Sequence, residues 1–140
     1  NLTSSHVIPA LILKFYNAMK NGDDVTLWGT GSASREFLYA PDCVEAIARA
    51  IETDISLDPI NIGTGKEITI KDLATEIAEQ MGYEGEIKWQ SDKPDGQPRR
   101  CLDTSKAKNL LDFEAETDLQ TGLKQTIEWF LNDKNWETKV

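Results

Sequence analysis

The chain contains one histidine, His6, which stands immediately before a long apolar run that begins at Val7. Imidazole titrates near neutral pH, and a histidine just ahead of a helix can project into a cleft and transfer protons. A lone histidine is also commonly a helix cap or a hydrogen-bonded polar residue. Because no second histidine or nearby cysteine accompanies it, we expect no metal site. The residues alone leave both a proton-transfer role and a structural role open.

The same run contains Tyr16 and Lys20, which show a Tyr-x-x-x-Lys spacing. Short-chain dehydrogenases use this spacing to place a tyrosine acid beside a lysine that lowers its pKa. However, the residues around Tyr16 are apolar enough to be buried, and Lys20 comes at the expected helix end, where a cation complements the helix dipole. We therefore interpret the pair as a core residue and a helix-end charge.

Glycine pairs occur at two places, but neither predicts a cofactor site. A dinucleotide site needs a glycine-rich turn between a strand and a helix, with an acidic residue about twenty positions later. Gly63 and Gly65 lack a third glycine, and the next helix starts several residues too late. Gly29 and Gly31 have no helix after them. We expect no cofactor-binding residue in this chain.

Three arginines, Arg35, Arg99 and Arg100, lie in expected loops or at strand ends beside loops. Guanidinium groups bind phosphate oxygens bidentately, so two arginines from different loops can hold a pyrophosphate. Simple solvation at the surface is the alternative. Trp28 precedes Gly29 and can stack on a base or belong to the core.

The elements that must position these candidates follow from the spacing of apolar and turn residues. We expect about five helices: over 7–19, after Pro41, from Thr69 to Gly82, after Asp103 or Thr104, and from about Thr117. We expect short strands at 25–28, 35–39, 59–63 and 86–90. This order predicts a mixed α/β fold that resembles a part completing a larger doubly wound sheet.

Two of the expected helices have a clear apolar face. The helix after Pro41 should turn four residues inward: Val44, Ile47, Ala48 and Ile51. The last helix should bury Leu119, Leu123, Ile127 and either Phe130 or Leu131.

Composition indicates one folded domain over residues 1–140, because 39% hydrophobic and 28% charged residues are typical of globular proteins. The net charge of -9 repels phosphate backbones, so we expect neither nucleic acid nor anionic membranes as partners. No stretch approaches about 18 consecutive apolar residues, and no secretion signal is evident. We therefore expect a cytoplasmic protein in which Cys43 and Cys101 stay reduced.

Four motifs occur in one order along the chain: SHVIPALILKF, VTLWGTGSASREFLY, INIGTG and KPDGQPRRCLD. In this order they resemble the GDP-L-fucose synthases, which are bifunctional epimerase-reductases of the extended short-chain dehydrogenase superfamily. REFLY and NIGTG are shared by many nucleotide-sugar epimerases and dehydratases, whereas SHVIPAL with KPDGQPRR points to the fucose-synthase branch. The resemblance extends from Ser5 to about Phe130.

The resemblance implies that this chain is the C-terminal, substrate-binding half of a longer enzyme, which we expect to be a homodimer. The N-terminal Rossmann half would bind NADP(H) and supply the Ser-Tyr-Lys triad and a catalytic cysteine. The chain alone would then bind no cofactor and catalyse nothing.

The resemblance also implies roles for residues around the first helix. His6 would belong to the acid/base pair that inverts carbons 3 and 5 of GDP-4-keto-6-deoxymannose, where the ketone acidifies the adjacent carbons. Val7, Leu11 and Lys14 would line the nucleotide pocket.

The remaining implied roles concern the base and the diphosphate. Trp28 would pack near the guanine or ribose, and Arg35 with Arg100, or with Arg99 as the second choice, would clamp the pyrophosphate.

Other functions stay open at this point. The chain could be the substrate domain of another NAD-dependent nucleotide-sugar epimerase or dehydratase, or a non-catalytic module that binds nucleotide sugars. A helical interaction domain that uses its acidic faces is a further alternative.

Overall fold

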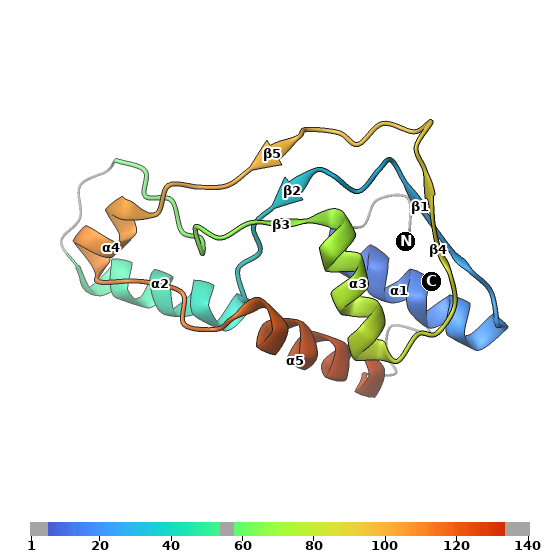
Figure 1. Cartoon of the computed structure of the whole chain (residues 1–140). Helices are drawn as coiled ribbons and strands as arrows, with labels where there is room; N and C mark the ends of the chain where they lie inside the picture. The colour runs from blue at the N-terminus through green and yellow to red at the C-terminus, as the bar shows by residue number, and fades with distance from the viewer. Residues whose placement is uncertain (1–5, 54–57, 134–140) are drawn as a thin grey trace.

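The computed structural model describes residues 6–53 and 58–133, and it has the mixed α/β organisation that the sequence predicts (Figure 1). The elements of these ranges are α1 (Val7–Asn21), β1 (Val25–Trp28), β2 (Ser34–Arg35), α2 (Ala40–Glu52), β3 (Ile68–Thr69), α3 (Ile70–Met81), β4 (Ile87–Gln90), β5 (Arg99–Arg100), α4 (Ser105–Leu111) and α5 (Leu119–Asn132). No helix in these two ranges is both long and apolar enough to cross a membrane.

Two segments far apart in the sequence, 25–35 and 87–100, run in the same direction side by side (Figure 1). At one end β1 pairs with β4 in parallel. At the other end β2 pairs in parallel with β5 and antiparallel with β3. The two parallel pairings bring residues more than sixty positions apart next to each other, so they determine where the candidate site residues lie.

The main hydrophobic core lies between α1, β1, α3 and α5. Phe15 of α1 and Leu73 of α3 are fully buried, and each such side chain contributes about 1.5–3 kcal/mol by leaving water. The Phe15 ring contacts the Tyr83 ring at a centroid distance of 5.1 Å. The buried residues of this core are Leu11, Ile12, Phe15, Ala18, Val25, Leu27, Leu73, Ala74, Ile77, Ala78, Leu123 and Ile127.

The ends of α3 are set by the residues that the sequence predicts. The Thr69 hydroxyl accepts a hydrogen bond from the Asp72 backbone N–H at 3.0 Å, and Gly82 adopts a left-handed φ of 69° after the last turn. Both features satisfy backbone groups that a helix end leaves without partners. The helix α5 begins close to the predicted position, and its N-cap is Asp118, whose side chain accepts from the Thr121 N–H at 2.7 Å.

The inner face of α5 resolves an alternative that the sequence leaves open. Leu123 and Ile127 are buried as predicted, and Leu119 packs against the core while remaining half-buried. Phe130 packs against this core as well, whereas Leu131 is 50% exposed.

Two of the expected strands are absent or shorter in the structure. Segment 59–63 has no strand, because no neighbouring strand lies beside it in the described residues and a strand needs a pairing partner. The strand expected over 35–39 is confined to Ser34–Arg35, where it has partners on both sides. The two-residue strands β3 and β5 are too short to show a period-2 pattern, so the sequence does not predict them.

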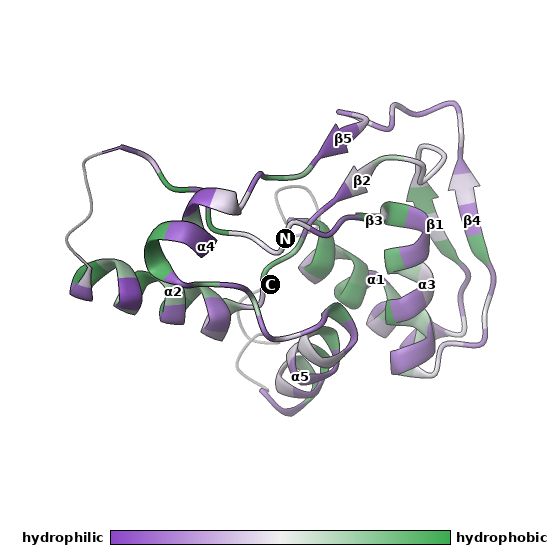
Figure 2. Ribbon diagram, turned by 60° about the vertical axis from the view of Figure 1, so that its left-hand side comes forward, coloured by the Kyte–Doolittle hydropathy of each residue, from purple (hydrophilic) through white to green (hydrophobic). Residues whose placement is uncertain are grey.

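The prediction for the inner face of α2 is wrong. Val44, Ile47 and Ile51 are 64%, 52% and 80% exposed, Ala48 is exposed too, and Ala46 on another side is fully buried. The helix lies at one end of the molecule, and its neighbour in the fold is α4 (Figure 2). The face is exposed because the described part of the chain supplies no element to cover it.

What α2 does bury belongs to a second and smaller core. This core contains Ala46, Ala107, Leu111 and Phe113, with Ala50, Ile60, Ile62 and Ala115 half-buried or packed around it. Two of its four buried members are alanines, which remove little apolar surface from water. The end of the molecule that carries α2 is therefore held less strongly than the end that carries α1 and α3.

Candidate functional site

Two of the predicted phosphate-binding arginines lie on adjacent strands. In the parallel pairing of β2 with β5, Arg35 stands directly beside Arg100. Residues opposite one another in neighbouring strands project from the same face of a sheet. The fold therefore brings together two guanidinium side chains that the sequence separates by 65 positions.

Arg99 is held differently from Arg100. The Arg99 Nε donates to both carboxylate oxygens of Glu67, at 2.8 and 2.9 Å. This contact lowers the pKa of Glu67, and the Ser34 hydroxyl, which donates to the same carboxylate at 2.8 Å, adds to the effect. Arg99 is therefore already neutralised within the fold.

No carboxylate pairs with Arg35 or Arg100 among the residues that the structure describes. Arg35 donates from one Nη to its neighbour's backbone, the Ser34 carbonyl, at 2.6 Å. Its remaining N–H groups and those of Arg100 are left for a ligand. An ionised oxygen is the acceptor that such donors bind most strongly.

Both glycine pairs hold a carboxylate of this chain. The Gly65 N–H donates to Glu36 Oε2 at 3.1 Å, and a Cβ at Gly63 would lie 2.5 Å from Glu36 Oε1. In the other loop, the Gly31 N–H donates to Asp95 Oδ1 at 3.2 Å. In each of the two glycine loops, a backbone N–H is therefore already engaged by a carboxylate of the chain itself.

The residues of α1 differ in how accessible they are. Lys14 Nζ donates to the Thr26 carbonyl of β1 at 2.8 Å, and partial burial lowers the pKa of Lys14. Val7 is half-buried, while Leu11 is 5% exposed and belongs to the main core. Leu11 can thus support a pocket wall but presents little surface of its own.

His6 occupies the N-cap position of α1 and its side chain is exposed. The imidazole makes no capping hydrogen bond, so the structural role considered for it does not apply to the side chain. The backbone of His6 does begin the helix, since its carbonyl accepts from the Ala10 N–H at 3.0 Å. The imidazole itself is left available for a substrate.

Tyr16 and Lys20 form a structural pair, as their positions in the helix predict. Lys20 Nζ lies 4.5 Å from the centroid of the Tyr16 ring. The Tyr16 ring also meets the Phe130 ring edge-to-face, at a centroid distance of 5.6 Å. This second contact joins α1 to α5.

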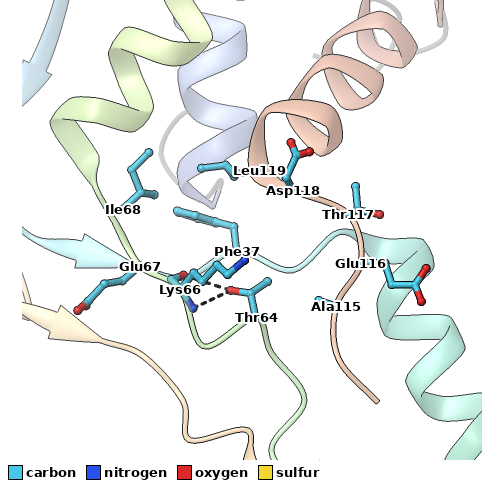
Figure 3. Close-up of a pocket in the computed structure, with 10 residues that line it drawn as sticks. All are labelled: Phe37, Thr64, Lys66, Glu67, Ile68, Ala115, Glu116, Thr117, Asp118 and Leu119. Carbon is cyan, nitrogen blue, oxygen red and sulfur yellow. Dashed lines mark hydrogen bonds between the residues drawn. The ribbon is translucent and has the colours of Figure 1, made fainter. Parts of the chain in front are cut away.

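Two neighbouring cavities, of about 320 and 220 Å³, surround Phe37, which sequence reasoning does not single out. Figure 3 shows the Phe37 ring between the start of α5 and the segment that leads into α3. Both cavities share residues 117–119, and none of the seven predicted site residues lines either one. Phe37 could have been suspected only from its place two residues after Arg35.

Trp28 completes the set of exposed candidates at the end of β1. Its side chain is 68% exposed, which is unusual for an aromatic ring of this size. Among the described residues no group of three or more histidine, cysteine, aspartate or glutamate side chains is arranged to hold a metal ion. The candidate site therefore combines half-buried Arg35 and exposed Arg100, on neighbouring strands, with the exposed indole of Trp28 at the end of β1.

Comparison with known proteins gives the site a context. Residues 1–63 match the model of the NAD dependent epimerase/dehydratase family. GDP-L-fucose synthase 1 of Arabidopsis thaliana is 41% identical over 131 residues, which is 93% of this chain and 40% of that protein. GDP-L-fucose synthase of Escherichia coli K12 is 38% identical over 143 residues, covering 95% of this chain and 44% of that protein.

The fold gives the same result. A crystal structure of a GDP-L-fucose synthetase from Naegleria fowleri bound to NADP superimposes with a TM-score of 0.89 at 30% identity, over 99% of this chain and 43% of that one. The chain thus spans about two fifths of the length of the proteins it resembles. The chain is therefore similar over most of its length to enzymes of nucleotide-sugar metabolism, and its residues 1–63 match the NAD dependent epimerase/dehydratase family.

Proposed function

We propose that residues 1–140 form the nucleotide-sugar-binding domain of an epimerase/reductase similar to the GDP-L-fucose synthases. The observation that carries this proposal is the pairing of Arg35 with Arg100 on adjacent strands, with neither guanidinium taken up by a carboxylate in the described residues. In a chain with a net charge of -9, such a pair is a suitable place for a dianionic diphosphate.

The substrate in this proposal is GDP-4-keto-6-deoxymannose. The two arginines bind the diphosphate oxygens, and the exposed ring of Trp28 stacks near the base or ribose. His6 transfers a proton at a carbon beside the ketone, because that carbon is acidified by the carbonyl and the imidazole can both give and accept a proton. Val7 and Lys14 border the nucleotide along α1.

NADP(H) supplies the hydride for the reduction in this proposal, and it is bound by a dinucleotide-binding domain that is not among the residues described. The hydrogen bonds from the glycine loops to Glu36 and Asp95 support placing the dinucleotide site outside this chain. The chain by itself is accordingly expected to bind substrate without turning it over.

We assign the contact with that second domain to the exposed apolar residues of α2. We call this surface the α2 face, and it consists of Val44, Ile47, Ala48 and Ile51. Three of its four side chains are large, apolar and more than half exposed. The relatives are more than twice as long as this chain, so additional structure is available in them to cover such a face. Covering it removes apolar area from water at roughly 25 cal/mol per Å².

The arginine pair predicts a specific binding pattern. The chain should bind GDP, and Arg35→Gln or Arg100→Gln should weaken binding by roughly 10- to 100-fold, since a hydrogen bond to a charged group contributes about 1.5–3 kcal/mol. Arg99→Gln is the matched control and should change the affinity by less than about threefold, because Arg99 is engaged by Glu67. Isothermal titration calorimetry measures all four proteins.

Two results would count against this assignment. A folded chain, verified by circular dichroism, that binds no GDP would remove the binding role. Equal affinity for GDP, UDP and dTDP would show that the site does not select guanine, which would remove the assignment to GDP sugars.

The role of His6 can be measured in a chimera in which this chain replaces the matching 44% of the E. coli GDP-L-fucose synthase. His6→Gln should slow formation of GDP-L-fucose from GDP-4-keto-6-deoxymannose by roughly 10²–10⁴-fold, which is the usual contribution of a general acid or base. The affinity for GDP should stay within about threefold. Product formation at an unchanged rate would contradict the proton-transfer role.

The α2 face predicts a substitution whose effect depends on context. In the isolated chain, Ile47→Asp should change the free energy of unfolding by less than about 0.5 kcal/mol, because the side chain is already in water. In the chimera the same substitution should cost at least about 2 kcal/mol, since it places a charge in an apolar interface. Leu131→Asp, at an exposed position on α5, is the control for urea denaturation in both proteins. Equal effects of Ile47→Asp in the two contexts would show that the α2 face stays uncovered.

A further inference from the structure

We propose that Asp95 is a positioning residue that keeps the loop before Arg100 at a fixed spacing from the loop that joins Trp28 to Arg35. The identity of the ligand rests on the proposed function, whereas the positioning itself does not. The two loops are residues 29–33, between β1 and β2, and residues 91–98, between β4 and β5.

The Asp95 carboxylate makes three hydrogen bonds to the first loop. Its Oδ1 accepts from the Thr30 backbone N–H at 2.6 Å and from the Gly31 backbone N–H at 3.2 Å. Its Oδ2 accepts from the Thr30 hydroxyl at 2.7 Å. The Thr30 hydroxyl and then its N–H are the largest causes that lower the pKa of Asp95, so the carboxylate is ionised at neutral pH and its bonds are charge-assisted.

The backbone of the first loop is built around this carboxylate. Gly29 and Gly31 both have a left-handed φ, 76° and 75°, a conformation in which successive backbone N–H groups can point at one anion. A Cβ at Gly29 would lie 2.2 Å from Asp95 Oδ1, and a Cβ at Gly31 would lie 2.6 Å from the Trp89 ring. Both positions therefore require glycine.

The rest of the second loop has little else to hold it. Residues 91–98 are all exposed, whereas the first loop is also attached to the start of α3, where Gly31 and Ala33 carbonyls accept from the Lys71 and Ile70 N–H groups. Backbone hydrogen bonds join the two segments at each end, from the Gly29 N–H to Gln90 and from the Ser34 N–H to Pro98. Asp95 makes the connection between those ends.

The consequence concerns Arg100, which follows directly after the second loop. If Asp95 is lost, the loop gains conformational freedom that ligand binding must then remove, at roughly 1–2 kcal/mol for each residue that becomes ordered. The pairing of β2 with β5, which sets Arg35 beside Arg100, has only two residues in each strand to resist this. A fixed loop therefore pre-organises the arginine pair for a diphosphate.

Three variants of the 140-residue chain test the proposal by calorimetric titration with GDP. Asp95→Ala should weaken binding at least tenfold. Asp95→Asn should stay within about threefold, because the amide oxygen still accepts from the two N–H groups and the amide nitrogen can donate to the Thr30 hydroxyl. Asp92→Ala is the control from the same loop, where the carboxylate lies 3.7 Å from Lys93 Nζ, and it should have no effect.

Amide hydrogen exchange at Ser34 reports the spacing without any ligand, because its N–H bonds to Pro98 across the two segments. Exchange should be at least tenfold faster in Asp95→Ala and unchanged in Asp95→Asn, while amides of α3 keep their wild-type rates. If Asp95→Ala speeds exchange at Ser34 but the wild-type chain binds no GDP, the positioning role of Asp95 holds and the nucleotide site is rejected. Wild-type exchange at Ser34 in Asp95→Ala, or an Asp95→Asn variant as weak as Asp95→Ala, would overturn the proposal.

Discussion

The parallel alignment of segments 25–35 and 87–100 is the constraint on which the candidate site depends. Trp28 and Arg35 belong to the first segment and Arg100 to the second, so their relative positions follow from this pairing. The main core supports this alignment, because β1 packs against α1, which in turn packs against α3. A sheet register that slipped by one residue would place Arg99 beside Arg35 and turn Arg100 to the opposite face.

The pairing of charged groups within the fold limits where this acidic chain can bind an anion. Each of the two glycine loops accommodates one carboxylate of the protein itself, from Glu36 and Asp95, and Arg99 is committed to Glu67. Arg35 and Arg100 keep most of their donors, and His6 keeps its imidazole, among the described residues. In a dinucleotide site, by contrast, the N–H groups of the glycine loop are left for a phosphate.

The sequence predicts the parts of the fold that depend on local spacing. The helix from Thr69 to Gly82 and the strand at 25–28 appear as expected, because a cap, a left-handed glycine and an apolar pattern are local signals. The sequence misplaces the inner face of α2, since an apolar stripe shows that a face prefers burial but not which element covers it. Asp95 and Phe37 are missed for a related reason, as their contacts join segments far apart in the chain.

We propose that the fold, and not the composition, makes a diphosphate site from one arginine of each segment. NMR spectra of the ¹⁵N-labelled chain, which resolve arginine Nε–H and tryptophan indole N–H signals, test it directly during titration with GDP. We expect the signals of Arg35, Arg100 and Trp28 to shift together, with one dissociation constant, while those of Arg99 and of the exposed indole of Trp129 stay in place. Shifts of Arg99 with no response from Arg35 and Arg100 would contradict it.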